Sequence, residues 1–71
     1  MYICGKNVAK EYLNGNEKIK KVFLNNNFND TEIMNLLKTK KIKIDYVDKR
    51  VLDNKTMGNH QGIILEVDDF E

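Results

Sequence analysis

Gly62-Ile63-Ile64-Leu65-Glu66-Val67 is the most apolar run of the chain, and this stretch decides the fold. Its branched side chains favour a strand, and the near absence of polar positions is typical of a strand that is covered on both faces. Helices are therefore expected on both sides of the sheet that contains it. The run is much shorter than the roughly 20 apolar residues that a membrane-spanning helix needs.

Three more strands are predicted upstream of this run. Tyr2–Cys4 is predicted as a short strand, and Ile19–Leu24 is rich in the branched and aromatic residues that favour strands. Between residues 42 and 46, apolar and polar side chains alternate. A period of two indicates a strand with one face in water.

Helices are predicted in the segments between the strands. Val8–Asn14 carries apolar residues at helical spacing, and Gly15 follows at the position where a helix end favours a positive φ. Asn29 has the character of a helix N-cap, with Glu32 three residues later, as in a capping box. A second helix is therefore predicted from there to about Lys40.

A third, short helix is predicted over Lys49–Asn54, with Asp48 as its cap. Alternation of strands and helices indicates the α/β class, here a three-layer α-β-α sandwich with a mixed or mostly parallel four-stranded sheet. A chain of 71 residues can bury one hydrophobic core. We expect one domain over residues 1–67, and residues 68–71, which have no helix or strand signal, to begin a linker.

The sequence offers little for catalysis or metal binding. Cys4 and His60 are the sole cysteine and histidine, whereas a structural zinc site needs four ligands at defined spacings. Cys4 lies in an apolar context in which cysteine usually acts as a small buried hydrophobe, and no phosphate-binding glycine-rich loop is present. We expect no catalytic centre, no metal and no bound cofactor within these residues. The lone cysteine and the absence of a secretory signal lead us to expect a cytoplasmic protein.

The charge is distributed unevenly along the chain. Residues 1–50 hold eleven Lys and Arg against six Asp and Glu, whereas residues 51–71 hold one against five. A basic body suits an anionic partner, because lysines near phosphates release condensed counterions. The candidates for contacts with the RNA backbone are Lys40, Lys41 and Lys43. The alternative is that these lysines form a solvated rim, as lysine-rich and asparagine-rich composition can arise on any surface.

A polar loop leads directly into the most apolar strand. Gly58 and Gly62 permit backbone angles that other residues avoid, so this loop can turn sharply. It presents three side chains that can donate and accept hydrogen bonds, as phosphate, ribose hydroxyl or base edges require: Asn59, His60 and Gln61. The alternative is that they bond to the local backbone and stabilise the turn. Among the aromatic residues, Phe28 in the asparagine-rich loop is the best candidate for stacking on a base.

Two separated motifs resemble a known family. Gly5-Lys6-Asn7 is followed by a short helix, then by Leu52-Asp53, and then by Gly58-Asn59-His60-Gln61-Gly62-Ile63. This arrangement resembles the N-terminal substrate-binding domain of SpoU/TrmH-type RNA 2′-O-ribose methyltransferases over roughly residues 2–67. The segment 58–63 is the specific part. The family often has Pro then Val where this chain has Val8 then Ala9, which leaves the start of the first helix open.

The resemblance implies a ribosomal-protein-like RNA-binding fold and a particular parent enzyme. Such enzymes join this domain to a C-terminal trefoil-knotted domain, which binds S-adenosylmethionine, dimerises and methylates a ribose 2′-hydroxyl of ribosomal or transfer RNA. The catalytic arginine of the family lies in that second domain, so the resemblance assigns no catalytic residue here. It implies contact with RNA by residues of both loops: Gly5, Lys6, Asn7, Asn59, His60 and Gln61.

Other functions remain compatible with the residues. A stand-alone RNA-binding module related to kink-turn binders would use the same loops, and a protein-interaction domain would bind the methyltransferase body or a ribosomal protein. Neither DNA nor a membrane is expected as a partner.

Overall fold

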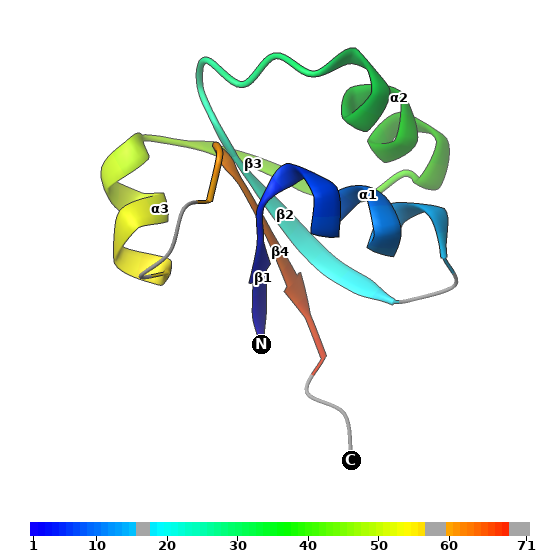
Figure 1. Ribbon diagram of the computed structural model, residues 1–71, viewed down its shortest axis with the longest axis horizontal. Helices are drawn as coiled ribbons and strands as arrows, with labels where there is room; N and C mark the ends of the chain where they lie inside the picture. Colours follow the sequence, from blue (N-terminus) through cyan, green and yellow to red (C-terminus); the bar gives the residue numbers. More distant parts are fainter. Residues whose placement is uncertain (16–17, 57–59, 69–71) are drawn as a thin grey trace.

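The computed structural model describes residues 1–15, 18–56 and 60–68. Along this part of the chain, strands and helices alternate (Figure 1): β1 (Tyr2–Cys4), α1 (Lys6–Asn14), β2 (Ile19–Asn25), α2 (Thr31–Lys40), β3 (Ile44–Val47), α3 (Lys49–Lys55) and β4 (Ile63–Val67). The order of elements is the one that the sequence predicts.

The four strands form one mixed sheet in the order β1-β4-β2-β3. β4 runs antiparallel to both β1 and β2, whereas β3 runs parallel to β2. The sequence predicted a mixed or mostly parallel sheet, and the structure has the mixed form. Because β4 alone runs in the reverse direction, the carboxyl ends of β1, β2 and β3 and the amino end of β4 meet at one edge of the sheet, which we term the carboxyl edge.

Helices cover both faces of the sheet, which confirms the predicted three-layer arrangement. Figure 1 shows α1 and α2 on one side of the sheet and α3 on the other. β4 contributes Ile63, Leu65 and Val67 to the larger hydrophobic core, which it shares with α1 and α2, and Ile64 to a smaller core with Leu52 of α3. This division explains why the apolar run of β4 is nearly continuous, since neighbouring side chains of a strand point to opposite faces.

The cap of α2 differs from the prediction by one residue. Asp30, not Asn29, is the N-cap, and its carboxylate accepts a hydrogen bond from the Ile33 amide at 3.1 Å. Glu32 does not complete a capping box; it lies 3.2 Å from the ammonium of Lys10 on α1. Asp30 is favoured because a carboxylate at a helix N-terminus also interacts with the positive end of the helix dipole.

The other helix ends also show differences from the expected pattern. Gly15 has an extended backbone with φ −94°, and the left-handed residue after a helix is instead Lys41, with φ 56°. α1 begins at Lys6, earlier than predicted. Asp48 occupies the predicted N-cap position of α3 but makes no side-chain hydrogen bond to the helix. Its carboxylate instead accepts a hydrogen bond from the side-chain amide of Asn26 at 3.3 Å.

The third predicted strand starts later in the structure than the sequence indicates, and the start of a linker at residues 68–71 stays a prediction. β3 begins at Ile44, so Ile42 lies before it, although both pack against the larger core. Asp68 pairs with Lys20 at 3.2 Å, and residues 69–71 lie outside the described residues.

The cap assignment can be tested by a pair of substitutions. Asp30→Ala should lower the free energy of unfolding by about 1 kcal/mol, because the Ile33 amide loses its acceptor. Asp30→Asn, which retains a capping oxygen, should recover most of that loss. Asn29→Ala is the matched control and should leave stability within roughly 0.5 kcal/mol of the parent in urea denaturation. Equal losses at positions 29 and 30 would contradict the assignment.

Candidate nucleic-acid interface

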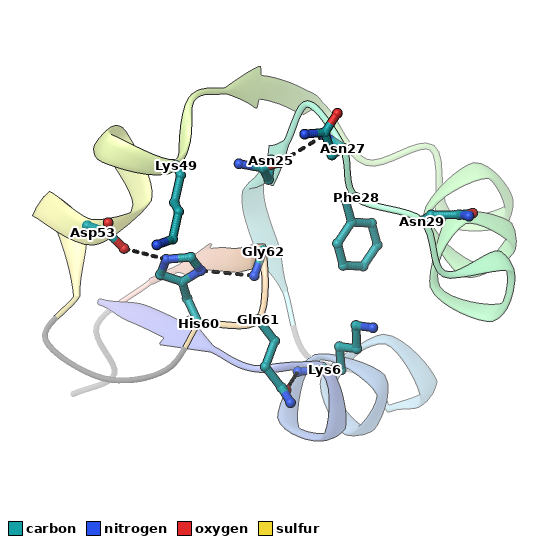
Figure 2. Close-up of a pocket in the computed structure, with 10 residues that line it drawn as sticks. All are labelled: Lys6, Asn25, Asn27, Phe28, Asn29, Lys49, Asp53, His60, Gln61 and Gly62. Atoms are coloured by element: carbon teal, nitrogen blue, oxygen red, sulfur yellow. Dashed lines mark hydrogen bonds and ion pairs between the residues drawn. The ribbon is translucent and has the colours of Figure 1, made fainter.

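Four segments of the chain surround a pocket of about 590 Å³ at the carboxyl edge. Figure 2 shows its lining: Lys6 after β1, the asparagine-rich loop after β2, two residues of α3, and the turn that enters β4. The segments are far apart in sequence and meet because the sheet brings the corresponding strand ends together. Pockets of this size, roughly 300–1,000 Å³, are typical of small-ligand sites.

The His60 side chain connects the turn before β4 to α3. Its ring is buried, with 7% of the residue exposed, and Nδ1 accepts a hydrogen bond from the Gly62 amide at 2.9 Å. A backbone N–H can only donate, so this bond assigns the ring proton to Nε2, which lies 2.7 Å from an Asp53 carboxylate oxygen. Both ring nitrogens are thus engaged within the protein. His60 therefore stabilises the turn before β4, which is the alternative to RNA contact that the sequence left open. Its contact with RNA stays a prediction.

Gln61 joins the two motifs that are separated in the sequence. Its side-chain Oε1 accepts a hydrogen bond from the Lys6 amide at 2.7 Å. That amide lies in the first turn of α1, where helical N–H groups have no partner within the helix. Gly5 supplies no capping side chain, and its amide donates to the carbonyl of Ile63 at 3.3 Å. The 5–7 and 60–62 motifs are therefore one structural unit.

Gly62 connects this unit to the asparagine-rich loop. Its φ of 86° is one that residues with a side chain rarely adopt, and a Cβ there would lie 3.2 Å from Phe28 Cδ1. The Gly62 carbonyl accepts from the Asn25 amide at 2.9 Å, and the Asn25 side chain in turn accepts from the Asn27 amide at 2.9 Å. The loop is thus shaped by its own asparagines, which mimic a backbone turn. The predicted need for glycine at position 62 is confirmed, whereas Gly58 lies outside the described residues.

The pocket combines cations with one aromatic ring. The Lys6 ammonium lies 5.7 Å from the centroid of the Phe28 ring, and Lys49 approaches from α3 (Figure 2). Lys49 makes no ion pair within the described part of the chain. Among the described residues that line the pocket, Asp53 is the only one with a carboxylate, and it already interacts with His60. The site is therefore suited to bind anions and hydrogen-bonding groups.

The structure divides the predicted RNA-contact residues into two groups. Those at the carboxyl edge are Gly5, Lys6, Asn7, His60 and Gln61, with Asn7 exposed in the first turn of α1. Those before the amino end of β3, at the other end of the sheet, are Lys40, Lys41 and Lys43. Lys40 donates to the Gly15 carbonyl at 3.1 Å, and all three lysines are exposed. Asn59, the remaining predicted contact, lies outside the described residues.

Sequence reasoning missed several residues of the pocket. Asn25, Lys49 and Asp53 were not predicted as site residues, although Asp53 belongs to the Leu52-Asp53 pair of the family resemblance. The repeated asparagines beside Phe28 were an available signal, since such clusters are unusual outside turns. No comparable signal marks Lys49, which enters the site only because α3 packs over the sheet.

Cys4 is not among the described residues that line the pocket. Cys4 is half-buried against the smaller core, with Sγ 3.5 Å from the Thr56 hydroxyl. Within residues 1–15, 18–56 and 60–68, no group of three or more potential ligands could hold a metal ion. In the same residues no helix has the length and apolar character to cross a membrane.

A substitution at position 62 should show how strongly the site depends on glycine. Gly62→Val should lower the free energy of unfolding by roughly 1–3 kcal/mol, because the side chain meets Phe28 and the backbone angle is strained. Gly15→Ala is the control, since an extended φ of −94° suits alanine and the loss should stay within about 0.5 kcal/mol. Thermal and urea unfolding measure both. A Gly62→Val chain with the parent melting temperature would contradict the strain.

Comparisons with known proteins confirm the resemblance inferred from the two motifs. Residues 2–71 match the family model described as RNA 2′-O ribose methyltransferase substrate binding. The Bacillus subtilis (strain 168) protein YacO, named for the TrmH family of tRNA/rRNA methyltransferases, is 32% identical over 73 residues. The match covers 99% of this chain but 29% of YacO. The chain therefore belongs to the family of substrate-binding domains of RNA 2′-O ribose methyltransferases.

Proposed function

We propose that this chain captures RNA, ribosomal or transfer, for a SpoU-type methyltransferase whose bond-making residues lie outside positions 1–71. The family match over residues 2–71 carries this proposal. The carboxyl edge supports it, because the groups gathered there bind rather than react. The His60–Asp53 pair resembles a catalytic dyad, but both ring nitrogens of His60 hold the protein together.

The chemistry of the pocket fits RNA. Lys6 and Lys49 supply positive charge for phosphates, and asparagine amides and Gln61 supply groups that both donate and accept. A ribose 2′-hydroxyl also donates and accepts, so such amides can match it. Contacts from lysines to phosphates position RNA without reading its sequence, which suits a domain that delivers substrate to a separate centre.

The rest of the parent enzyme would supply the methyl donor and the dimer interface. S-Adenosylmethionine supplies an activated methyl group on a sulfonium cation, and the pocket of this domain, with its two lysines, is a poor match for a cation. We propose that the cofactor binds to a second domain, that this domain forms the homodimer, and that the enzyme works in the cytoplasm. The chain spans 29% of the length of YacO, which leaves ample room for such a domain in a relative.

Salt dependence should reveal whether the pocket lysines meet phosphates. Binding of a structured RNA hairpin should weaken as salt rises, and Lys6→Ala and Lys49→Ala should each reduce the slope of log affinity against log salt by about 1. Lys38→Ala on the exposed side of α2 is the matched control and should retain the parent slope. Fluorescence anisotropy with labelled RNA measures all four proteins. An affinity that does not respond to salt would favour a protein partner instead.

The lysines at the other end of the sheet can be tested separately. Replacing Lys40 and Lys43 by Ala and Lys41 by Gly removes their charge without strain, because glycine suits the left-handed backbone at position 41. The triple variant should keep the parent melting temperature and bind the RNA hairpin more weakly. The loss of affinity should be similar for hairpins of different nucleotide sequence. Unchanged affinity would restrict the interface to the carboxyl edge.

A further inference from the structure

Phe28 occupies an unusual place for an aromatic side chain. It packs partly against the larger core, yet it also lines the polar pocket at the carboxyl edge. Figure 2 shows its ring projecting between the asparagine-rich loop and Lys6. Phe23, by contrast, is 7% exposed and its ring meets Tyr2 in an edge-to-face contact. Of the two phenylalanines in the described part of the chain, Phe28 is therefore the one that a ligand in the pocket can reach.

The backbone of Gly62 and the ammonium of Lys6 are neighbours of the ring. Gly62 has no side chain, and any Cβ there would approach Phe28 to 3.2 Å. The Lys6 ammonium lies over the ring at 5.7 Å from its centroid. A half-exposed contact of this kind is weak, and the long lysine side chain can exchange it for a nearby anion.

Hydrogen-bonding groups border the same space. The Asn25 side chain uses its oxygen for the Asn27 amide, so its NH₂ group stays available to donate. Within the described part of the chain, the side chains of Asn27 and Asn29 have no hydrogen-bond partner, and neither does the Lys49 ammonium. A flat apolar face, amide groups and two ammonium groups are therefore gathered in one pocket.

We propose that this pocket receives a single unstacked nucleotide of the RNA, with its base against Phe28 and its phosphate near Lys6 and Lys49. The inference rests on the proposed function and specifies which feature of RNA the domain recognises. A base within a duplex has both faces covered by its neighbours, so it cannot reach a ring inside a pocket. A bulged or loop nucleotide has a free face, and stacking accepts any base because every base has a π-face.

The chain contains no tryptophan, which provides a direct reporter. Phe28→Trp introduces one indole in the pocket, and two hairpin RNAs are titrated against it: one with a one-nucleotide bulge, and one with the bulge deleted. The bulged RNA should quench the tryptophan fluorescence and bind at least about fivefold more tightly than the paired RNA. Equal quenching by both RNAs, or none by either, would overturn the proposal.

A second variant isolates the contribution of the aromatic face. Phe28→Leu keeps an apolar side chain against the core and should abolish the preference for the bulged RNA, while affinity for the paired RNA stays at the parent value. Tyr46→Leu is the control, because Tyr46 is an aromatic residue with 56% exposure that does not line the pocket. Circular dichroism establishes whether each variant is folded. If the Phe28→Leu variant does not fold, the Phe28→Trp titration alone tests whether a base stacks in the pocket.

The outcomes separate the two proposals. If the parent chain binds neither RNA, the proposed function is wrong. If it binds both equally and Phe28→Leu changes nothing, RNA capture stands and the nucleotide pocket is wrong. Capture of a protein partner by the same pocket, with no RNA binding, would contradict both.

Discussion

Burial of β4 on both faces is the constraint on which the rest of the structure depends. Ile63, Ile64 and Leu65 are fully buried, and neighbouring residues of a strand point in opposite directions. Neither face can be left to water, so α1 and α2 cover one and α3 covers the other. Burying each of these side chains contributes about 1.5–3 kcal/mol, which a domain of this size cannot forgo.

The position of β4 also creates the site. β4 lies between β1 and β2 and runs opposite to both, so its entrance is next to their carboxyl ends. Hydrogen bonds connect the turn before β4 to three other elements. The His60 side chain bonds to Asp53 of α3, and the Gln61 side chain to the first amide of α1. The Gly62 carbonyl accepts from the Asn25 amide at the end of β2. Two of these bonds use side chains that the sequence predicted to contact RNA, those of His60 and Gln61. If RNA binds here as proposed, hydrogen bonds that already fix these groups would lower the entropy lost on binding.

Positive charge is present at both ends of the sheet but is organised differently. At the carboxyl edge, Lys6 and Lys49 border a pocket that also holds an aromatic ring and amides. At the other end, Lys40, Lys41 and Lys43 are exposed and do not line this pocket. Nearby, at the amino end of β2, Lys21 is paired with Asp45 at 2.9 Å and Lys20 with Asp68 at 3.2 Å. Among the described residues, the lysines of the carboxyl edge are therefore combined with aromatic and amide groups in one pocket, whereas those at the other end form an exposed basic surface.

Local patterns were sufficient for the elements and for part of the site. Hydrophobic periodicity predicted four strands and three helices in order, and the unbroken apolar run predicted helices on both faces, because these signals depend on residues close together in the chain. The position of the cap was missed, because Asn29 and Asp30 are both good N-caps and only the structure shows that the Asp30 carboxylate meets the Ile33 amide. The motifs around Gly5 and His60 were identified by resemblance, and so was the family.

Tertiary structure decided what those motifs do. The direction of each strand depends on pairings between distant segments, such as Tyr2 with Glu66, which no local pattern contains. The same is true of the hydrogen bond from the Lys6 amide to Gln61 and of the place of Lys49 in the pocket. It is also true of the position of the two basic groups at opposite ends of the sheet. The sequence by itself determined which residues are apolar, turn-forming or hydrogen-bonding. Only the fold decided which of them meet, because contacts across a sheet depend on the burial of all its strands together.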